Sequence, residues 1–214
     1  MTNAQTPETQ SAITPSRAVE ILKEGNARFV SGRAESRDYR AQVAQTSGGQ
    51  YPFAAVVSCI DSRIPTEIVF DQGIGDVFNA RIAGNFVNED ILGSLEFACK
   101  VAGAKAIVVM GHTACGAIKG ACDHAELGNL TQLLGKISPA VEDTHTPEGT
   151  DRSSANAEFV DRVAAKNVEL TIGNIKKMSP VLNEMHEAGD LTIVGSMYSV
   201  GTGEVTFFNP EEMT

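Results

Sequence analysis

Two uninterrupted apolar runs constrain the fold of this chain more than any other feature. They are FAAVVSC (53–59) and AKAIVVMGH (104–112), and both are rich in branched aliphatic residues. Runs of this kind are typical of strands buried on both faces, as in a parallel sheet covered by helices. The segment between them, EDILGSLEFACKVAG (89–103), carries apolar residues at helical spacing and ends in glycine. This alternation predicts an α/β fold with a mostly parallel sheet.

The other elements extend the same pattern. Strands are expected in DVFNARIAG (76–84), LTIVGSMYS (191–199) and GEVTFFN (203–209), the last two joined by a tight turn at VGTG (200–203). The sheet would then have about four parallel strands and a C-terminal antiparallel edge strand. Helices are expected to flank it, over 14–32, 38–49, 65–70, 89–103, 115–126, 129–143, 157–178 and 180–187, and 144–156 is expected to be a loop.

The chain is long enough for one large domain with a substantial core. We expect a flexible polar tail over residues 1–13 and a single α/β domain over 14–214, with an N-terminal helical arm at about 14–48. The first residues do not resemble a signal peptide, and no apolar stretch is long enough to cross a bilayer. Four cysteines are too few for a disulfide scaffold, so thiols or metal ligands in a reducing cytoplasm are expected.

The charge balance argues against two classes of partner. With 17 basic and 27 acidic side chains, the net charge is −10 at pH 7. An acidic surface repels phosphate backbones and anionic lipid headgroups. We therefore expect neither nucleic acid nor a membrane as a partner.

The ends of the two apolar runs predict a metal site. Ligands of parallel sheets bind at the carboxyl ends of the strands, where Cys59 and His112 both fall. Cys115 follows His112 in a His-x-x-Cys turn. Two thiolates and an imidazole suit Zn²⁺, and three protein ligands leave one position open, as in catalytic zinc sites.

The remaining cysteines and histidines favour other roles. Cys122 lies two helical turns beyond Cys115, roughly 10 Å away at ~1.5 Å per residue, which is too far to share one ion. Cys99 and Cys122 are therefore expected to be core residues. The remaining histidines, His124, His145 and His186, lie in helical or polar contexts and are expected to be solvated.

Asp61 and Arg63, in SCIDSR (58–63), leave two interpretations open. A neighbouring carboxylate and guanidinium are most often a surface ion pair of small energetic weight. Two residues from a metal ligand, however, they are better placed to act on a bound substrate.

Cys-x-Asp-x-Arg followed by His-x-x-Cys-Gly resembles the β-class carbonic anhydrases. The resemblance extends to FDQGIGDVFNARIAGN, ILGSLEFA, GHTACGAIKGA and VGSMYSVGTGEVTFF, and so covers most of the chain from about Pro15. The position after Cys-Gly, usually a second glycine, is Ala117 here. The chain has no tryptophan, so it cannot form the tryptophan-containing bicarbonate pocket of some members.

The resemblance implies one Zn²⁺ per chain on Cys59, His112 and Cys115, with Asp61 and Arg63 as a catalytic dyad. It implies reversible hydration of carbon dioxide to bicarbonate by a zinc-bound hydroxide, with the N–H of Gly116 supporting a substrate oxygen. It also implies a homodimer or a dimer of dimers, in which the helix at 15–30 packs across the partner subunit. Two thiolates neutralise the ion's formal charge, so its water needs help from surrounding residues.

Three alternatives differ in chemistry. A hydrolase of carbon disulfide or carbonyl sulfide can use the same metal motif, and access to the pocket would separate it. A non-catalytic zinc-stabilised module does not explain the open ligand position. A thiol redox protein would be expected to carry a close Cys-x-x-Cys pair, which the sequence lacks.

Overall fold

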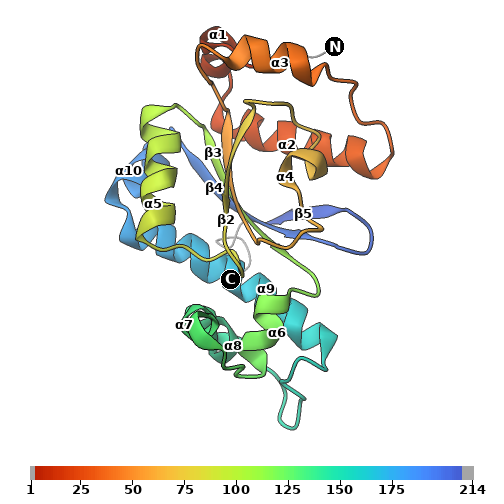
Figure 1. Cartoon of the computed structure of the whole chain (residues 1–214). Helices are drawn as coiled ribbons and strands as arrows, with labels where there is room; N and C mark the ends of the chain where they lie inside the picture. Colours follow the sequence, from red (N-terminus) through yellow and green to blue (C-terminus); the bar gives the residue numbers. More distant parts are fainter. Residues whose placement is uncertain (1–2, 209–214) are drawn as a thin grey trace.

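The computed structural model describes residues 3–208, which form one five-stranded sheet with helices on both faces (Figure 1). The strand order is β2-β1-β3-β4-β5. Strands β1 to β4 are parallel, and β5 runs antiparallel to β4 at one edge. The strands are β1 (Ala54–Ser58), β2 (Val77–Arg81), β3 (Ala106–His112), β4 (Thr192–Tyr198) and β5 (Val205–Phe208). The predicted fold class and sheet are confirmed.

The helices follow the predicted order with one addition, α1, and two refinements. The helix expected at 89–103 finishes as a π-helix, and the one expected at 129–143 is divided in two because Ser138-Pro139 starts a new helix. The helices are α1 (Pro7–Ser11), α2 (Pro15–Val30), α3 (Tyr39–Thr46), α4 (Thr66–Val69), α5 (Glu89–Glu96), η1 (Phe97–Val101), α6 (Gly116–Cys122), α7 (Gly128–Gly135), α8 (Ser138–Asp143), α9 (Ala157–Met178) and α10 (Pro180–Glu187).

The core has two layers, one on each face of the sheet. Every residue of β1 and β3 is buried, and alternate residues enter opposite layers. Ala54 and Val56 pack with α2, α6, α8 and the first half of α9, whereas Ala55 and Val57 pack with α5, η1, α10 and the second half of α9. In Figure 1, α6, α7 and α8 lie beyond the carboxyl ends of the parallel strands, next to α9. The helices therefore enclose this end of the sheet.

The first residues are not the loose tail that the sequence suggested. Thr6 caps α1 with a reciprocal bond to Thr9, and Pro7 occupies the first helical turn. Gln10 is buried, and its Nε2 donates to Pro52 O at 2.7 Å and to Ala102 O at 2.8 Å. These contacts tie the segment to the sheet. Residues 1–2 of the expected tail and 209–214 of the expected domain lie outside the described residues.

The apolar face of α2 packs in the core of its own chain. Ala18 and Leu22 are 0% exposed and belong to the core. Asn26 donates to Val69 O and Gly203 O and accepts from the N–H of Val205. Much of this face is therefore covered by the chain's own core, and the expected packing of the helix across a partner subunit stays a prediction.

A buried ion-pair network attaches the segment after α2 to the segment between α4 and β2. The Asp71 carboxylate accepts from Arg28 Nε at 2.5 Å, from Arg37 Nη1 and from the N–H of Glu35. The side chains of Arg37 and Asp71 are 5% and 2% exposed. Burial raises the pKa of Asp71, but the hydrogen bonds from Arg28, Arg37 and Glu35 outweigh it and the net pKa is lowered. The carboxylate is thus held charged.

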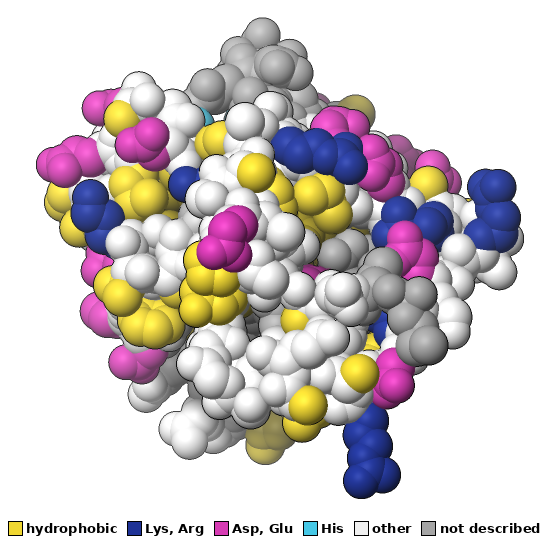
Figure 2. Space-filling view, turned by 90° about the horizontal axis from the view of Figure 1, so that it is seen from above, with side chains coloured by type: hydrophobic (Ala, Val, Ile, Leu, Met, Phe, Trp, Pro, Cys, Tyr) yellow, Lys and Arg dark blue, Asp and Glu magenta, His cyan; other side chains and the backbone are white. Residues whose placement is uncertain are grey.

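On the surface, the face seen from above in Figure 2 shows basic side chains standing singly or in short groups among acidic ones. Across residues 3–208, no helix combines the length and the apolar character needed to cross a membrane. The cytoplasmic location expected from the sequence stays a prediction.

We predict that Asp71→Asn lowers the free energy of unfolding by about 3 kcal/mol at pH 7, because it leaves the buried guanidinium of Arg37 with only the more distant and more exposed carboxylate of Glu35 as its counter-charge. The native pKa of Asp71 lies below the ordinary value of 3.8. The contribution of the Asp71 charge to the free energy of unfolding is therefore complete above pH 3.8. It is lost as the pH falls through the native pKa of Asp71, which is lower. Urea unfolding at neutral pH and at several values below 3.8 measures both effects.

The control is Glu20→Gln, which removes the half-exposed partner of Lys23. It should change the free energy of unfolding by about 0.5 kcal/mol or less. A loss in Asp71→Asn that stays the same at every pH would contradict the assignment to charge.

Candidate metal centre

The pairing of β1 with β3 brings Cys59 and His112 to the same edge of the sheet. The register runs from Ala54 opposite Ala106 to Ser58 opposite Met110. Cys59 follows Ser58 directly, and His112 is the last residue of β3. The chain then turns, and Cys115 is the N-cap of α6. Three residues at or just beyond the ends of two neighbouring strands thus converge.

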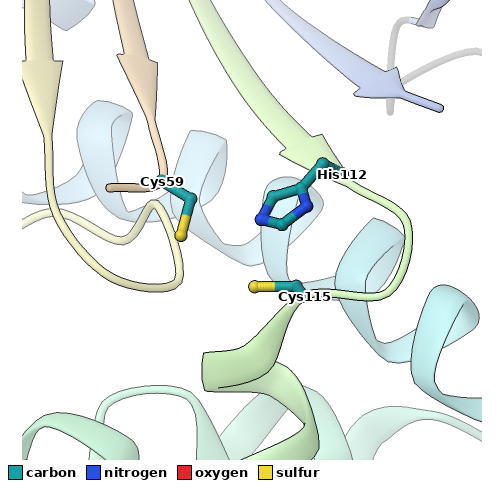
Figure 3. Close-up of side chains that lie close together, drawn as sticks. All are labelled: Cys59, His112 and Cys115. Carbon is teal, nitrogen blue, oxygen red and sulfur yellow. The ribbon is translucent and has the colours of Figure 1, made fainter. Parts of the chain in front are cut away.

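The ligand atoms of Cys59, His112 and Cys115 all lie within 4.8 Å of one another. Figure 3 shows the two thiols and the imidazole pointing toward a common point. The residues are 4%, 0% and 1% exposed. Two soft sulfur donors and one nitrogen donor are the ligand types that Zn²⁺ prefers.

The orientation of His112 is set by its own backbone. Its Nδ1 lies 3.0 Å from Thr113 O, and because a carbonyl oxygen can only accept, Nδ1 carries the proton. Nε2 is then an acceptor, and this buried atom has no hydrogen-bond partner among the described residues. A buried nitrogen lone pair without a partner is costly, and a metal ion would satisfy it.

Cys59 is held by the loop that follows β2 at the same edge of the sheet. The N–H of Gly84 donates to Cys59 Sγ at 3.4 Å, and Asn167 Nδ2, from α9, donates to Gly84 O at 2.7 Å. Gly84 has a φ of +78°, and an added Cβ would lie 2.4 Å from Ile137 Cδ1. Only glycine fits this close approach without displacing Ile137.

Cys115 follows a turn that is fixed to the C-terminal hairpin. The N–H of Thr113 donates to Tyr198 O at 3.0 Å, and the N–H of Val200 donates to Thr113 Oγ1 at 3.1 Å. The direction of the chain between His112 and Cys115 is therefore set by contacts with β4 and the residues after it.

Asp61 and Arg63 form a two-pronged ion pair beside the cluster. Arg63 Nε donates to Asp61 Oδ1 at 2.9 Å and Nη2 to Oδ2 at 2.7 Å, while the N–H of Arg63 also donates to Oδ1 at 2.9 Å. Asp61 Oδ2 lies 4.0 Å from His112 Nε2. The Arg63 guanidinium, with its side chain half exposed, holds the pKa of Asp61 well below its usual range.

Sequence reasoning missed Arg81, Gly84 and Asn167. Arg81 Nε donates to Cys59 O at 2.9 Å and Nη2 to Asp61 O at 2.6 Å, so this side chain fixes the backbone that carries both groups. Its position was detectable, because Arg81 ends a strand at the same sheet edge. Nothing in the local sequence pairs Asn167 with Gly84, which lies 83 residues earlier.

The other candidates, apart from His186, lie where the sequence suggested. Cys99 and Cys122 are buried in the two core layers, and neither belongs to the metal-ligating group found among residues 3–208. Burial raises the pKa of Cys99 to about 12, which keeps its thiol protonated. His124 and His145 are exposed, whereas His186 is half-buried with its Nδ1 3.1 Å from Leu191 O.

The two cluster thiols affect each other's ionisation. The neighbouring Cys115 thiol, and then the N–H of Gly84, lower the pKa of Cys59 in spite of its burial. The shared hydrogen bond with Cys59 and burial raise the pKa of Cys115. Without a cation, Cys59 and Cys115 therefore keep one proton between them. A bound divalent ion would allow both side chains to be thiolates.

Comparison with known proteins identifies the family. The carbonic anhydrase family model matches residues 54–205. Carbonic anhydrase 2 of Mycobacterium tuberculosis is 37% identical over 198 residues, which cover 88% of this chain and 90% of that protein. The chain belongs to the β-carbonic anhydrase family. Carbonic anhydrase of Mycolicibacterium smegmatis is 36% identical over 195 residues, covering 89% and 92% of the two chains. The crystal structure of the β-carbonic anhydrase CafA of Aspergillus fumigatus superposes with a TM-score of 0.67 at 26% identity, covering 91% of this chain and 90% of that one.

β-Carbonic anhydrases are zinc enzymes, and the residues present in this one fit the ion. The donor set is thiolate, imidazole and thiolate, the donor atoms are buried together, and His112 Nε2 lacks any other partner among the described residues. Cys59, His112 and Cys115 are therefore the residues that would hold Zn²⁺.

We predict that Cys115→Ser loses most of the zinc, because a neutral hydroxyl replaces a thiolate. Cys122→Ser, a change of the same chemistry at another buried position of α6, should keep about one zinc per chain. Metal analysis of both purified variants, with circular dichroism to verify folding, makes the comparison. Full zinc occupancy in folded Cys115→Ser would remove Cys115 from the ligand set.

Proposed function

We propose that this β-carbonic anhydrase converts carbon dioxide and water reversibly to bicarbonate and a proton, with one Zn²⁺ on Cys59, His112 and Cys115. Zinc at such a site supplies a nucleophile at neutral pH by lowering the pKa of a water molecule. The observation that carries the proposal is the Asp61–Arg63 ion pair, fixed at the edge of the cluster with Asp61 Oδ2 4.0 Å from His112 Nε2.

Asp61 is the proposed hydrogen-bond acceptor and orienting group. Its carboxylate is charged, since Arg63 lowers its pKa, so it accepts hydrogen bonds and donates none. A nucleophile that donates to Asp61 keeps its lone pair free to face the carbon of the substrate. The carboxylate thereby fixes the direction of attack without changing its own protonation state.

Arg63 is the proposed holder of Asp61. Its two parallel hydrogen bonds occupy both carboxylate oxygens and keep the group out of the cluster. Without them, the carboxylate would be free to turn toward the cation and block the position that substrate chemistry needs. Lysine could not replace this planar, two-pronged contact.

Gly116 is the proposed support for a substrate oxygen. It begins α6 directly after Cys115, and an added Cβ there would meet no atom within 4 Å. The residue itself is exposed, so a small substrate could approach its backbone.

We predict that Arg63→Ala and Asp61→Asn both keep zinc and both lose activity, by about 100-fold or more. The reasons differ. In Arg63→Ala the freed carboxylate of Asp61 becomes a fourth protein ligand. In Asp61→Asn the amide can itself donate a hydrogen bond, so it no longer requires the nucleophile to donate one. Stopped-flow hydration of carbon dioxide gives the rates, and X-ray absorption should find four protein ligands in the first variant and three in the second.

The control is Arg17→Ala, which removes a half-exposed guanidinium that pairs with Glu24 on α2. It should leave the rate unchanged. A near-normal rate of carbon dioxide hydration by Arg63→Ala, at neutral and at alkaline pH, would show that Arg63 forms only a surface ion pair with Asp61. Hydrolysis of carbon disulfide by a wild type that does not hydrate carbon dioxide would instead favour the alternative substrate.

We also propose that two copies of the chain associate through the open edge formed by β2, α5 and η1. β2 lies at the edge of the sheet, and a cavity of about 520 Å³ separates it from α5. Phe97 is 50% exposed here and lies edge-on to Phe78, with ring centroids 6.3 Å apart. A sheet edge beside an exposed aromatic side chain can be self-complementary about a two-fold axis.

We predict that Phe97→Glu converts the oligomer to monomers, because it places a charge in the centre of that contact. Leu127→Glu is the matched control, since Leu127 is 71% exposed and lies elsewhere, just before α7. Sedimentation velocity distinguishes the species. An unchanged sedimentation coefficient for folded Phe97→Glu would place the interface elsewhere.

A further inference from the structure

The turn between His112 and Cys115 contains a strained residue. Ala114 has a φ of +54°, in the left-handed region that alanine rarely adopts because its Cβ crowds the following carbonyl. Ala114 is the residue immediately before the Cys115 ligand. Relaxation of its backbone would redirect the Cα–Cβ bond of Cys115, and with it the thiol.

An α9 side chain contacts this turn at the strained residue. The N–H of Ala114 donates to Asp161 Oδ1 at 2.9 Å, and the two residues are 47 positions apart in the chain. Asp161 lies in the second turn of α9 and is half-buried. The neighbouring Thr113 is already held by Tyr198 and Val200, so the bond to Asp161 extends the restraint to the next residue.

The same helix also reaches the loop of the other thiol. Asn167 holds Gly84, whose N–H donates to Cys59 Sγ. α9 packs against β3 and β4, which makes it a rigid support for both loops. The relative position of the two thiols therefore depends on α9, although α9 supplies no ligand.

We propose that Asp161 is a positioning residue for the metal centre. Its carboxylate oxygen, as a hydrogen-bond acceptor, keeps Ala114 in the left-handed conformation and so keeps Cys115 Sγ in the cluster. The inference rests on the proposed zinc site. It predicts that the acceptor oxygen matters and the negative charge does not.

The experiment compares Asp161→Ala with Asp161→Asn. Asparagine keeps an oxygen that can accept from Ala114 N–H, whereas alanine removes it. Zinc affinity is measured by competition with a chelator, and the cobalt(II)-substituted protein reports the thiolates through its sulfur-to-metal charge-transfer bands. We expect about 10- to 100-fold weaker zinc binding and shifted bands in Asp161→Ala, with near-wild-type values in Asp161→Asn.

A second substitution tests the mechanism directly. Glycine adopts a positive φ without the steric cost that alanine has, so Ala114→Gly should need less help from Asp161. In the Asp161→Ala protein, adding Ala114→Gly should raise the zinc affinity about tenfold. In the wild-type protein, Ala114→Gly should have little effect on zinc affinity. A role of Asp161 in general stability alone would produce no such rescue.

The matched control is Glu158→Ala, which removes an exposed carboxylate from the first turn of the same helix. It should leave zinc affinity and the cobalt spectrum unchanged. Should Asp161→Ala fail to fold, Asp161→Ser takes its place, since the serine oxygen is too short to reach the turn.

Three outcomes would overturn the proposal. Equal losses in Asp161→Asn and Asp161→Ala would assign the effect to charge, unchanged zinc affinity in a folded Asp161→Ala would remove the role, and absence of rescue by Ala114→Gly would exclude the backbone mechanism. A wild type that binds no zinc would instead defeat the proposed function on which the inference rests.

Discussion

The register between β1 and β3 is the constraint on which the site depends. Both strands are buried on both faces, and their parallel pairing puts Ser58 opposite Met110. This places Cys59 and His112 one and two residues beyond the last pair, at one edge of the sheet. A slip of one residue would turn every side chain of one strand to the other face, so the apolar core and the ligand cluster are fixed by the same hydrogen-bond ladder.

Around that edge, the backbone is held by polar side chains from distant parts of the chain. Arg81 binds the carbonyl oxygens of Cys59 and Asp61, Asn167 holds Gly84, and Asp161 binds the N–H of Ala114. Apart from the exposed bond to Asp61 O, each contact satisfies a backbone group that would otherwise be partly or fully buried without a partner. These contacts restrain the loops at the edge of the sheet, and a metal centre of defined geometry requires such restraint.

The N-terminal segments show how polar contacts can integrate a region that looks peripheral. Gln10 donates to two carbonyl oxygens, Asn26 links α2 to the C-terminal hairpin, and Asp71 gathers two arginines. None of these contacts has a local pattern, because each partner is at least 34 residues away in sequence. Composition alone therefore favoured a loose tail, whereas these contacts make α1 part of the domain.

The sequence by itself determined the order of strands and helices, the parallel sheet and the three residues of the cluster. Apolar periodicity is a local property, and Cys59 and His112 end the two runs that periodicity identifies most clearly. The roles proposed for Asp61 and Arg63 also came from local spacing and family resemblance. Only the tertiary structure decided which remote side chains support the ligands, that much of the apolar face of α2 packs in its own core, and that Ala114 is strained. These depend on contacts between residues far apart in the chain, whose geometry is set by the packing of whole elements and has no local signature.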